Sequence, residues 1–445
     1  MTELGPETIT LILLGSVLAG ILLGFPLAYV IGGVALVVGI ATLGMQSTTQ
    51  ILYQRAYDLV QNYSLIAVPL FVFMGLMLER SGIAEALYDA LYLWLGGFRG
   101  GLAVATVLIG TIMAACVGVI AASVTMLTLV ALPSMIRKGY DKGMAAGTCC
   151  VGGTLGILIP PSIMLVVYGP MAQLSVGKLF MAAVFPGLLL AGLYCLYIIV
   201  RCLVRPADGP PVPIEERRVP FATKTVVLLK SLLPPALLIL AVLGSIFFGI
   251  APPTEAAAVG ATAATLLAIA YRKFSLRVLK EVALETMRIG SFVLFIGAMS
   301  FALVGVFLVL GCGRVVEGLI LSAPGGNWGA FTVIMVMVFL LGMFIDWIGI
   351  LFIIVPIIAP LSVQLGMDPL WFGMMIIVNL QMSFNTPPFA PAIFFVKGSA
   401  ADELHLSTAE VIRGVLPFVA LIVLGLVLCI IFPQIILWLP GMMIK

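Results

Sequence analysis

Two pairs of consecutive prolines, each preceded by small or polar residues, are the positions in this sequence best suited to ligand chemistry. Proline has no backbone N–H and its ring clashes with the preceding turn, so two in succession cannot lie inside an unbroken helix. A helix broken inside a membrane leaves carbonyls and hydroxyls unpaired, and these suit a Na⁺ ion that has lost its water shell. The pairs are Pro160-Pro161, preceded by Gly153, Thr154 and Gly156, and Pro387-Pro388, preceded by Asn379, Gln381, Ser383, Asn385 and Thr386.

Three further polar side chains could contribute to cation sites at the two breaks. Ser123 and Thr125 follow an apolar stretch in the first half, and Asp346 lies within the apolar segment GMFIDWIGI in the second. An ionisable group in such surroundings is costly to bury, so it is a candidate for cation or substrate binding. A carboxylate could also cap the helix that follows it, and the two roles are compatible. The predicted Na⁺ ligands are Ser123, Thr154, Asp346, Asn385 and Thr386. The alternative is that the proline pairs only kink helices and shape the bundle.

The elements that must hold these residues are predicted to be membrane helices. The 445 residues are 62% hydrophobic and 9% charged, whereas about a quarter of an ordinary soluble domain is charged. Apolar runs of about 20 residues, the length at which a helix crosses a bilayer, recur along the chain. His405 is the only histidine, so the sequence lacks the residues for a histidine-based metal centre or a catalytic triad with a buried histidine. We therefore expect neither an enzyme nor a cofactor. The seven cysteines form no CxxC motif or Cys/His cluster.

The distribution of Lys and Arg predicts the orientation, because short cytoplasmic loops retain positive charge. All but four of the 22 basic residues fall in a few polar segments that we assign to the cytoplasm. The four exceptions are Arg55, Lys178, Arg314 and Lys445. Both termini are therefore predicted to lie outside the cytoplasm.

Two long apolar stretches predict re-entrant helical hairpins. Residues 100–136 must leave the cytoplasmic face and return to it, because basic segments flank them on both sides. The tip is expected within residues 116–122, where Gly118 can turn the chain. Residues 327–365 repeat the pattern from the outer face. Non-helical backbone at such depth is tolerated only where it faces protein or a water-filled cavity.

An internal repeat relates the two halves. The segments beginning at Ala131 and Ile358 overlay with a constant offset of 227 residues, which pairs Asp141 with Asp368 and one proline pair with the other. Because the hairpins are predicted to enter from opposite faces, the halves have inverted topology, as in secondary transporters. We expect an all-α polytopic membrane protein with about ten spans, two hairpins and two broken helices. Amphipathic stretches at Ile83–Leu95 and 314–321 precede the hairpins.

Four segments resemble the large membrane subunit of tripartite ATP-independent periplasmic transporters. They are RKGYDKGMAAGTCCVGGTLGILIPPS, TEAAAVG, GMFIDWIGILFIIVPIIAP and NLQMSFNTPPFAPAIFFVKG, and the resemblance extends over nearly the whole chain. It implies an elevator mechanism, in which a transport domain slides against a scaffold. It also implies Na⁺ coupling, import of small organic anions, mostly carboxylates, a separate four-helix membrane subunit and a periplasmic substrate-binding protein. The chain would then span a bacterial inner membrane several times, with both termini in the periplasm.

The resemblance also assigns residues and domains. The first hairpin tip falls on Gly118, Ala122 and Ser123, and the first break on Gly153, Thr154, Gly156, Pro160, Pro161 and Ser162. The second tip falls on Asp346, and the second break on Asn379, Gln381, Ser383, Asn385, Thr386, Pro387 and Pro388. The scaffold helices would lie in residues 1–82 and 226–311. The two halves of the transport domain, each with its amphipathic arm, would be residues 83–200 and 312–445. Residues 201–225 would form the cytoplasmic linker.

Two other classes of function remain open at this point. One is a self-sufficient carboxylate transporter of the same fold, coupled to Na⁺ or H⁺ and independent of a binding protein. The other is a membrane-embedded enzyme, which the scarcity of intramembrane ionisable residues disfavours. Anionic lipid headgroups are expected near Lys273, Arg277 and Lys280, because this basic stretch is amphipathic. No nucleic-acid partner is expected.

Overall fold

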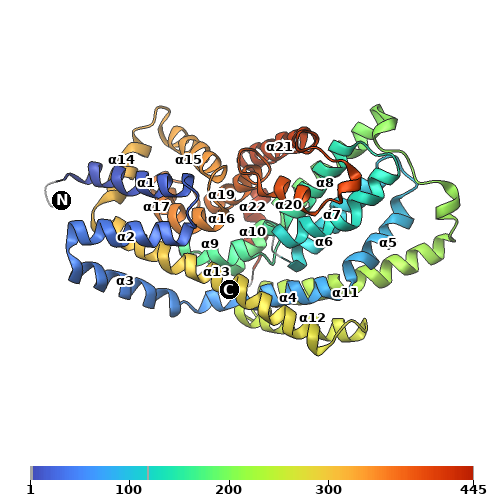
Figure 1. Ribbon diagram of the computed structural model, residues 1–445, viewed down its shortest axis with the longest axis horizontal. Helices are drawn as coiled ribbons and strands as arrows, with labels where there is room; N and C mark the ends of the chain where they lie inside the picture. The colour runs from blue at the N-terminus through green and yellow to red at the C-terminus, as the bar shows by residue number, and fades with distance from the viewer. Residues whose placement is uncertain (1–3, 118–119, 444–445) are drawn as a thin grey trace.

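The computed structural model describes residues 4–117 and 120–443, and every regular element in these ranges is a helix. By length and composition, seven helices could cross a membrane, or eight if the bent pair α14 and α15 counts as one span. Several shorter apolar helices accompany them. The predicted helical class is therefore confirmed, while the number of about ten spans stays a prediction. Figure 1 shows α1 and α14 toward one end of the long axis, and α5 toward the other.

The first half begins with five helices ahead of its hairpin. The predicted amphipathic stretch is helix α5, and it begins after Gly82, whose left-handed φ of 72° ends the preceding turn. The bounds are α1 Pro6–Leu22, α2 Leu27–Leu43, α3 Met45–Val60, α4 Ala67–Arg80 and α5 Ile83–Leu95. Next come the hairpin helices α6 Gly101–Val117 and α7 Ile120–Arg137, then α8 Lys142–Thr154, α9 Ile163–Ala172 and α10 Val176–Val204.

The second half repeats this order. Its hairpin returns through several short helical pieces, including a π-helical turn at Ile350–Ile354, because Pro356 and Pro360 interrupt the backbone hydrogen bonding. The opening helices are α11 Phe221–Phe247, α12 Pro253–Ala270, α13 Leu276–Val309 and α14 Cys312–Leu321. The hairpin consists of α15 Gly326–Gly342, α16 Trp347–Gly349, α17 Val355–Ile358 and α18 Leu361–Gln364. The remaining helices are α19 Pro369–Ser383, α20 Pro391–Ser399, α21 Thr408–Ile431 and α22 Gln434–Gly441.

The two halves pack against each other reciprocally. Helix α2 packs on α13 while α12 packs on α4, and α1 packs on α14 while α11 packs on α5. In the same way, α8 packs on α21 and α19 on α10. The broken helices also begin alike: Asp141 and Asp368, 227 residues apart, are both N-caps whose carboxylates accept backbone N–H bonds. Such exchanges are what two halves related by a twofold axis produce, and they agree with the predicted repeat.

The connection between the halves is a short segment between two long helices. Helix α10 continues to Val204 and α11 begins at Phe221, so residues 205–220 join them. Two backbone bonds of 2.8 Å, from Gly100 N to Gly209 O and from Val212 N to Gly96 O, hold this linker against the turn between α5 and α6. An ion pair between Lys138 and Glu216 holds it to the end of α7. In Figure 1 the linker lies at the right-hand end, beside α5.

Candidate functional site

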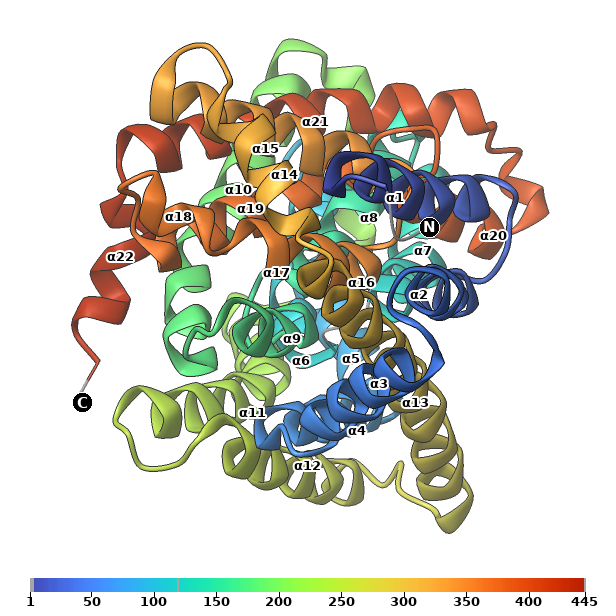
Figure 2. The same ribbon diagram turned by 90° about the vertical axis from the view of Figure 1, so that its left-hand side faces the viewer.

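The two helix breaks meet in the interior of the molecule. The first lies between α8 and α9 and the second between α19 and α20, and the peptide bond inside each proline pair is cis. The side chain of Asn385 in the second break donates a hydrogen bond of 3.2 Å to Thr154 Oγ1 in the first. Both residues are buried. In Figure 2 both α8 and α19 lie in the central part of the view, with other helices around them. Polar residues 231 positions apart are thus joined into one site.

The polar residues of α19 and the turn after it divide into two sets, because residues four apart lie on one helical face. Asn379 Nδ2 donates to Met335 O at 2.7 Å, and Ser383 Oγ donates to Phe339 O at 3.2 Å. These two side chains fasten α19 to α15, the first helix of the second hairpin. Gln381 and Asn385 form the other set, joined by a 2.9 Å bond from Asn385 Nδ2 to Gln381 O. The second set belongs to the site between the breaks.

Four buried polar atoms of the predicted site residues lack a hydrogen-bond partner among the described residues. They are Ser123 Oγ, Asn385 Oδ1 and both amide atoms of Gln381. Buried polar groups are nearly always paired, and an unpaired one costs about 1–3 kcal/mol. The oxygens of these side chains are the hard, uncharged ligands that suit an alkali cation. Oxygens of this kind are present at Ser123, Thr154 and Asn385, and whether they bind Na⁺ stays a prediction.

Gly153 brings the first hairpin against the first break. A Cβ built on Gly153 would lie 2.4 Å from Val124 Cγ2, 2.7 Å from Val124 Cα and 2.8 Å from Val124 N. Only glycine allows the backbones of α7 and α8 to approach this closely. Ser123 directly precedes Val124, and Thr154 directly follows Gly153, so this contact places the two candidate ligands on adjoining segments.

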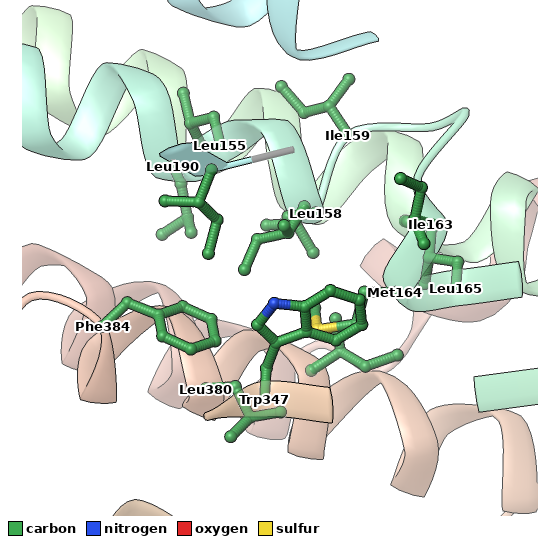
Figure 3. Close-up of a cluster of buried hydrophobic side chains, with 14 of the residues drawn as sticks. Leu155, Leu158, Ile159, Ile163, Met164, Leu165, Leu190, Trp347, Leu380 and Phe384 are labelled. Atoms are coloured by element: carbon green, nitrogen blue, oxygen red, sulfur yellow. The ribbon is translucent and has the colours of Figure 1, made fainter. Parts of the chain in front are cut away.

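The space beside the breaks is apolar and filled by Trp347. This residue, at the start of the returning arm of the second hairpin, is buried. Figure 3 shows its indole between Leu158 of the first break and two residues from the end of α19, Leu380 and the C-cap residue Phe384. Leu155, Ile159, Ile163, Met164, Leu165 and Leu190 surround the same cluster. Trp347 therefore packs in the core. Such surroundings exclude water and strengthen the interaction of any cation with nearby dipoles.

The other predicted residues lie around this centre. Thr125 accepts a 3.1 Å bond from Ser399 at the end of α20, so it faces the second half's broken helix. Ser162 Oγ donates to Ile157 O within the first break, and Thr386 Oγ1 donates to Met382 O at 2.8 Å. Gly156, Pro160 and Pro161 are buried, Ala122 and Pro387 are half-buried, and Pro388 is exposed. Gly118 lies outside the described residues.

Asp346 stands at the tip of the second hairpin. It is half-buried and occupies the N-cap position before Trp347, without a side-chain capping bond. The backbone of its hairpin is tied to the second break by a 3.1 Å bond from Phe389 N to Met343 O. The second tip therefore lies against the break of its own half. Whether its carboxylate binds a cation stays a prediction.

Sequence reasoning missed the partners of these residues. The carbonyls of Met335 and Phe339 carry no signal in a sequence, and Ser399 lies in an ordinary polar segment. The helical spacing of Asn379 and Ser383 against Gln381 and Asn385 could have separated the two sets. Within the described residues, no group of three or more His, Cys, Asp or Glu side chains could hold a metal ion.

Comparison with known proteins gives consistent matches over nearly the whole chain. The family model described as tripartite ATP-independent periplasmic transporter, DctM component, matches residues 14–435. The C4-dicarboxylate TRAP transporter large permease protein DctM of Pseudomonas aeruginosa is 32% identical over 388 residues, which cover 87% of this chain and 88% of that protein. The ectoine/5-hydroxyectoine TRAP transporter large permease protein of Ruegeria pomeroyi is 30% identical over 420 residues, or 94% and 96% of the two chains.

Among solved structures, the YdaH transporter of Alcanivorax borkumensis has a similar fold. Its crystal structure superposes with a TM-score of 0.64 at 16% sequence identity and covers 89% of this chain and 91% of that one. At this identity the likeness concerns the fold alone.

Proposed function

Because this chain belongs to the DctM-component family of tripartite ATP-independent periplasmic transporters, we propose that it is the large permease subunit of a Na⁺-coupled importer. The proposed substrates are small organic anions, most simply carboxylates, as the name of the Pseudomonas relative suggests. The names of the two relatives differ in substrate, so the proposal concerns a chemical class rather than one compound. Relatives that are permeases also argue against the enzyme alternative.

One observation carries the proposed coupling to Na⁺. The hydrogen bond from Asn385 to Thr154 joins the two breaks, and buried oxygens of Ser123, Asn385 and Gln381 lack partners among the described residues. A dehydrated cation would satisfy them, since its binding energy offsets the cost of leaving them unpaired. Asp346 and Thr386 are proposed as further ligands, supplied by the second hairpin tip and the second break. The coupling ion is cargo here, and no cofactor is proposed.

The proposed mechanism is an elevator movement of the hairpins and broken helices against the opening helices. The packing supports such a division: α2, α3, α4 and α12 pack with one another or with α13, whereas α7, α8, α19 and α21 pack among themselves and with α6 and α10. Amphipathic α5 contacts both α11 and α6, and α14 contacts both α1 and α15. These two arms would connect the bodies while they slide.

The proposed assembly includes two partners, a four-helix membrane subunit and a periplasmic protein that delivers the substrate. We propose a bacterial inner-membrane location with both termini in the periplasm, based on the clustering of basic residues in segments assigned to the cytoplasm. In this orientation the linker of residues 205–220 lies in the cytoplasm.

Reconstitution tests this function. Proteoliposomes containing this chain and the four-helix subunit should accumulate labelled succinate, used as the carboxylate probe, when the binding protein and an inward Na⁺ gradient are both present. Omitting either protein, or replacing Na⁺ by K⁺, should abolish accumulation. Accumulation by the chain alone would support the self-sufficient alternative instead, and equal uptake in K⁺ would exclude Na⁺ coupling.

A further inference from the structure

A cavity of about 520 Å³ lies between the opening helices and the moving parts of the proposed elevator. One wall is formed by α3, which contributes Arg55, and by α13, which contributes Phe301 and Leu308. The opposite wall comes from the end of α9 and from the second hairpin, through Gln173 and Val363. A volume of this size is in the range of small-molecule sites, about 300–1,000 Å³. The cavity is separate from the polar cluster at the helix breaks.

Arg55 is the one charged side chain among the described residues that line this cavity. It is also one of the four basic residues outside the cytoplasmic segments, so the positive-inside rule does not account for it. A cation among otherwise uncharged lining residues attracts anions, and a guanidinium can hold a carboxylate with two parallel hydrogen bonds. The lining therefore suits a carboxylate.

The position of Arg55 is set by the adjoining helix. A Cβ added to Gly305 of α13 would lie 2.8 Å from Arg55 Cγ and 3.1 Å from its Nε. The glycine thus leaves room for the arginine stem to lie along α13. The nearest acid is Asp58, whose carboxylate is 3.6 Å from the guanidinium, and both side chains are partly exposed. Such a pair is weak, so an incoming carboxylate can compete with Asp58 for Arg55.

We propose that this cavity is an anion-selective outer vestibule, in which a carboxylate of the incoming substrate pairs with Arg55 before it reaches the helix breaks. This inference rests on the proposed function for the identity of the anion and for the outward orientation. It adds a second binding position, on the opening helices rather than on the hairpins, that each substrate molecule occupies on its way in.

A cavity at the equivalent place in the other half supports a role in the transport path. It has a volume of about 600 Å³ and is lined by Thr125 and Leu129, which the 227-residue offset pairs with Phe352 and Pro356 of the Arg55 cavity. Its charges are mixed, since Glu79 and Glu85 accompany Arg80 and Lys273. This second cavity, on the inner face, therefore does not retain an anion, whereas the Arg55 cavity on the outer face attracts it.

The charge of the cavity can be measured by thiol labelling of the full chain in detergent or liposomes. Val363 lines the cavity and is 70% exposed, so Val363→Cys gives a reporter, with the unsubstituted chain as the blank for native cysteines. An anionic methanethiosulfonate reagent should react faster with it than a cationic one. Arg55→Gln should lower this ratio of rates about fourfold, the effect of one charge at roughly 10 Å. Arg55→Lys should preserve the ratio, and Asp58→Asn should raise it.

A second measurement tests ligand binding directly. Excess succinate should slow labelling of Val363→Cys by a neutral maleimide, while its uncharged diamide should not, and Arg55→Gln should remove the protection. Arg314→Gln is the matched control, because Arg314 is another exposed basic residue outside the cytoplasmic segments and lines a different cavity.

The outcomes separate this inference from the proposed function, because labelling requires neither partner proteins nor an ion gradient. An unchanged rate ratio in Arg55→Gln, or equal protection by succinate and its diamide, would overturn the vestibule even if reconstituted uptake succeeds. A failed uptake assay together with Arg55-dependent protection would count against the proposed function and leave the anion site standing.

Discussion

The side chain of Asn385 reaches from one helix break to Thr154 in the other, at 3.2 Å, and so ties the two halves together at their most polar point. Since Asn385 also bonds the Gln381 carbonyl of its own half, its amide nitrogen is fully used and its oxygen points elsewhere. Neither break can shift alone without breaking this bond. In an elevator movement, the two breaks would have to travel as one body.

Replacing Ser123 by alanine should affect the thermal stability and the Na⁺ dependence of uptake in different ways. Its buried hydroxyl has no partner among the described residues, so Ser123→Ala should leave the thermal stability unchanged or raise it, by up to about 1 kcal/mol. If the hydroxyl binds Na⁺, the same change should raise the Na⁺ concentration for half-maximal uptake about tenfold, equivalent to about 1.4 kcal/mol.

The matched control for Ser123 is Thr128→Val on the same helix, because the Thr128 hydroxyl already donates to Val124 O. This variant should keep the Na⁺ dependence of the wild type. Identical Na⁺ activation curves for Ser123→Ala and the wild type would exclude the Ser123 hydroxyl as a ligand.

Gly153→Ala should abolish uptake. The new Cβ would lie 2.4–2.8 Å from side-chain and backbone atoms of Val124, and overpacking of this kind typically costs about 1–3 kcal/mol. Because the backbone itself is in the way, α7 must move away from α8 and separate Ser123 from Thr154. Gly192→Ala in α10, where no atom beyond the helix's own nearby backbone lies within 4 Å of the added Cβ, should transport normally. Normal uptake by Gly153→Ala in membranes would mean that the close approach of the two helices is not needed.

Asp346→Asn separates charge from shape at the second hairpin tip. The amide keeps nearly the same volume at this N-cap position, and Asn is as good an N-cap as Asp. If the carboxylate contributes to cation binding, uptake should fall at least tenfold while the amount of folded protein in the membrane stays constant. Wild-type uptake rates in this variant would leave Asp346 with a structural role only.

The elements of this fold could be predicted where the sequence carries strong local signals. The proline pairs predict both breaks, the long apolar stretches predict both hairpins, and the amphipathic spacing of Ile83–Leu95 predicts α5 at its observed bounds. What could not be predicted depends on distant contacts. Asn379 and Asn385 are the same residue type six positions apart, yet one bonds α15 and the other bonds Thr154. The cavity beside Arg55 likewise depends on how α3, α9, α13 and the second hairpin pack.

The difference between these two asparagines allows the most direct test of the central claim, that the contact between the breaks is the Na⁺ site. Asn379→Ala leaves a carbonyl of α15 without its partner and should cost about 1 kcal/mol of stability, with no change in the Na⁺ concentration for half-maximal uptake. Asn385→Ala should raise that concentration at least tenfold at similar stability. The measurement is a Na⁺ titration of initial uptake rates in proteoliposomes for both variants and the wild type. Equal half-maximal Na⁺ concentrations for Asn385→Ala and Asn379→Ala would contradict the account.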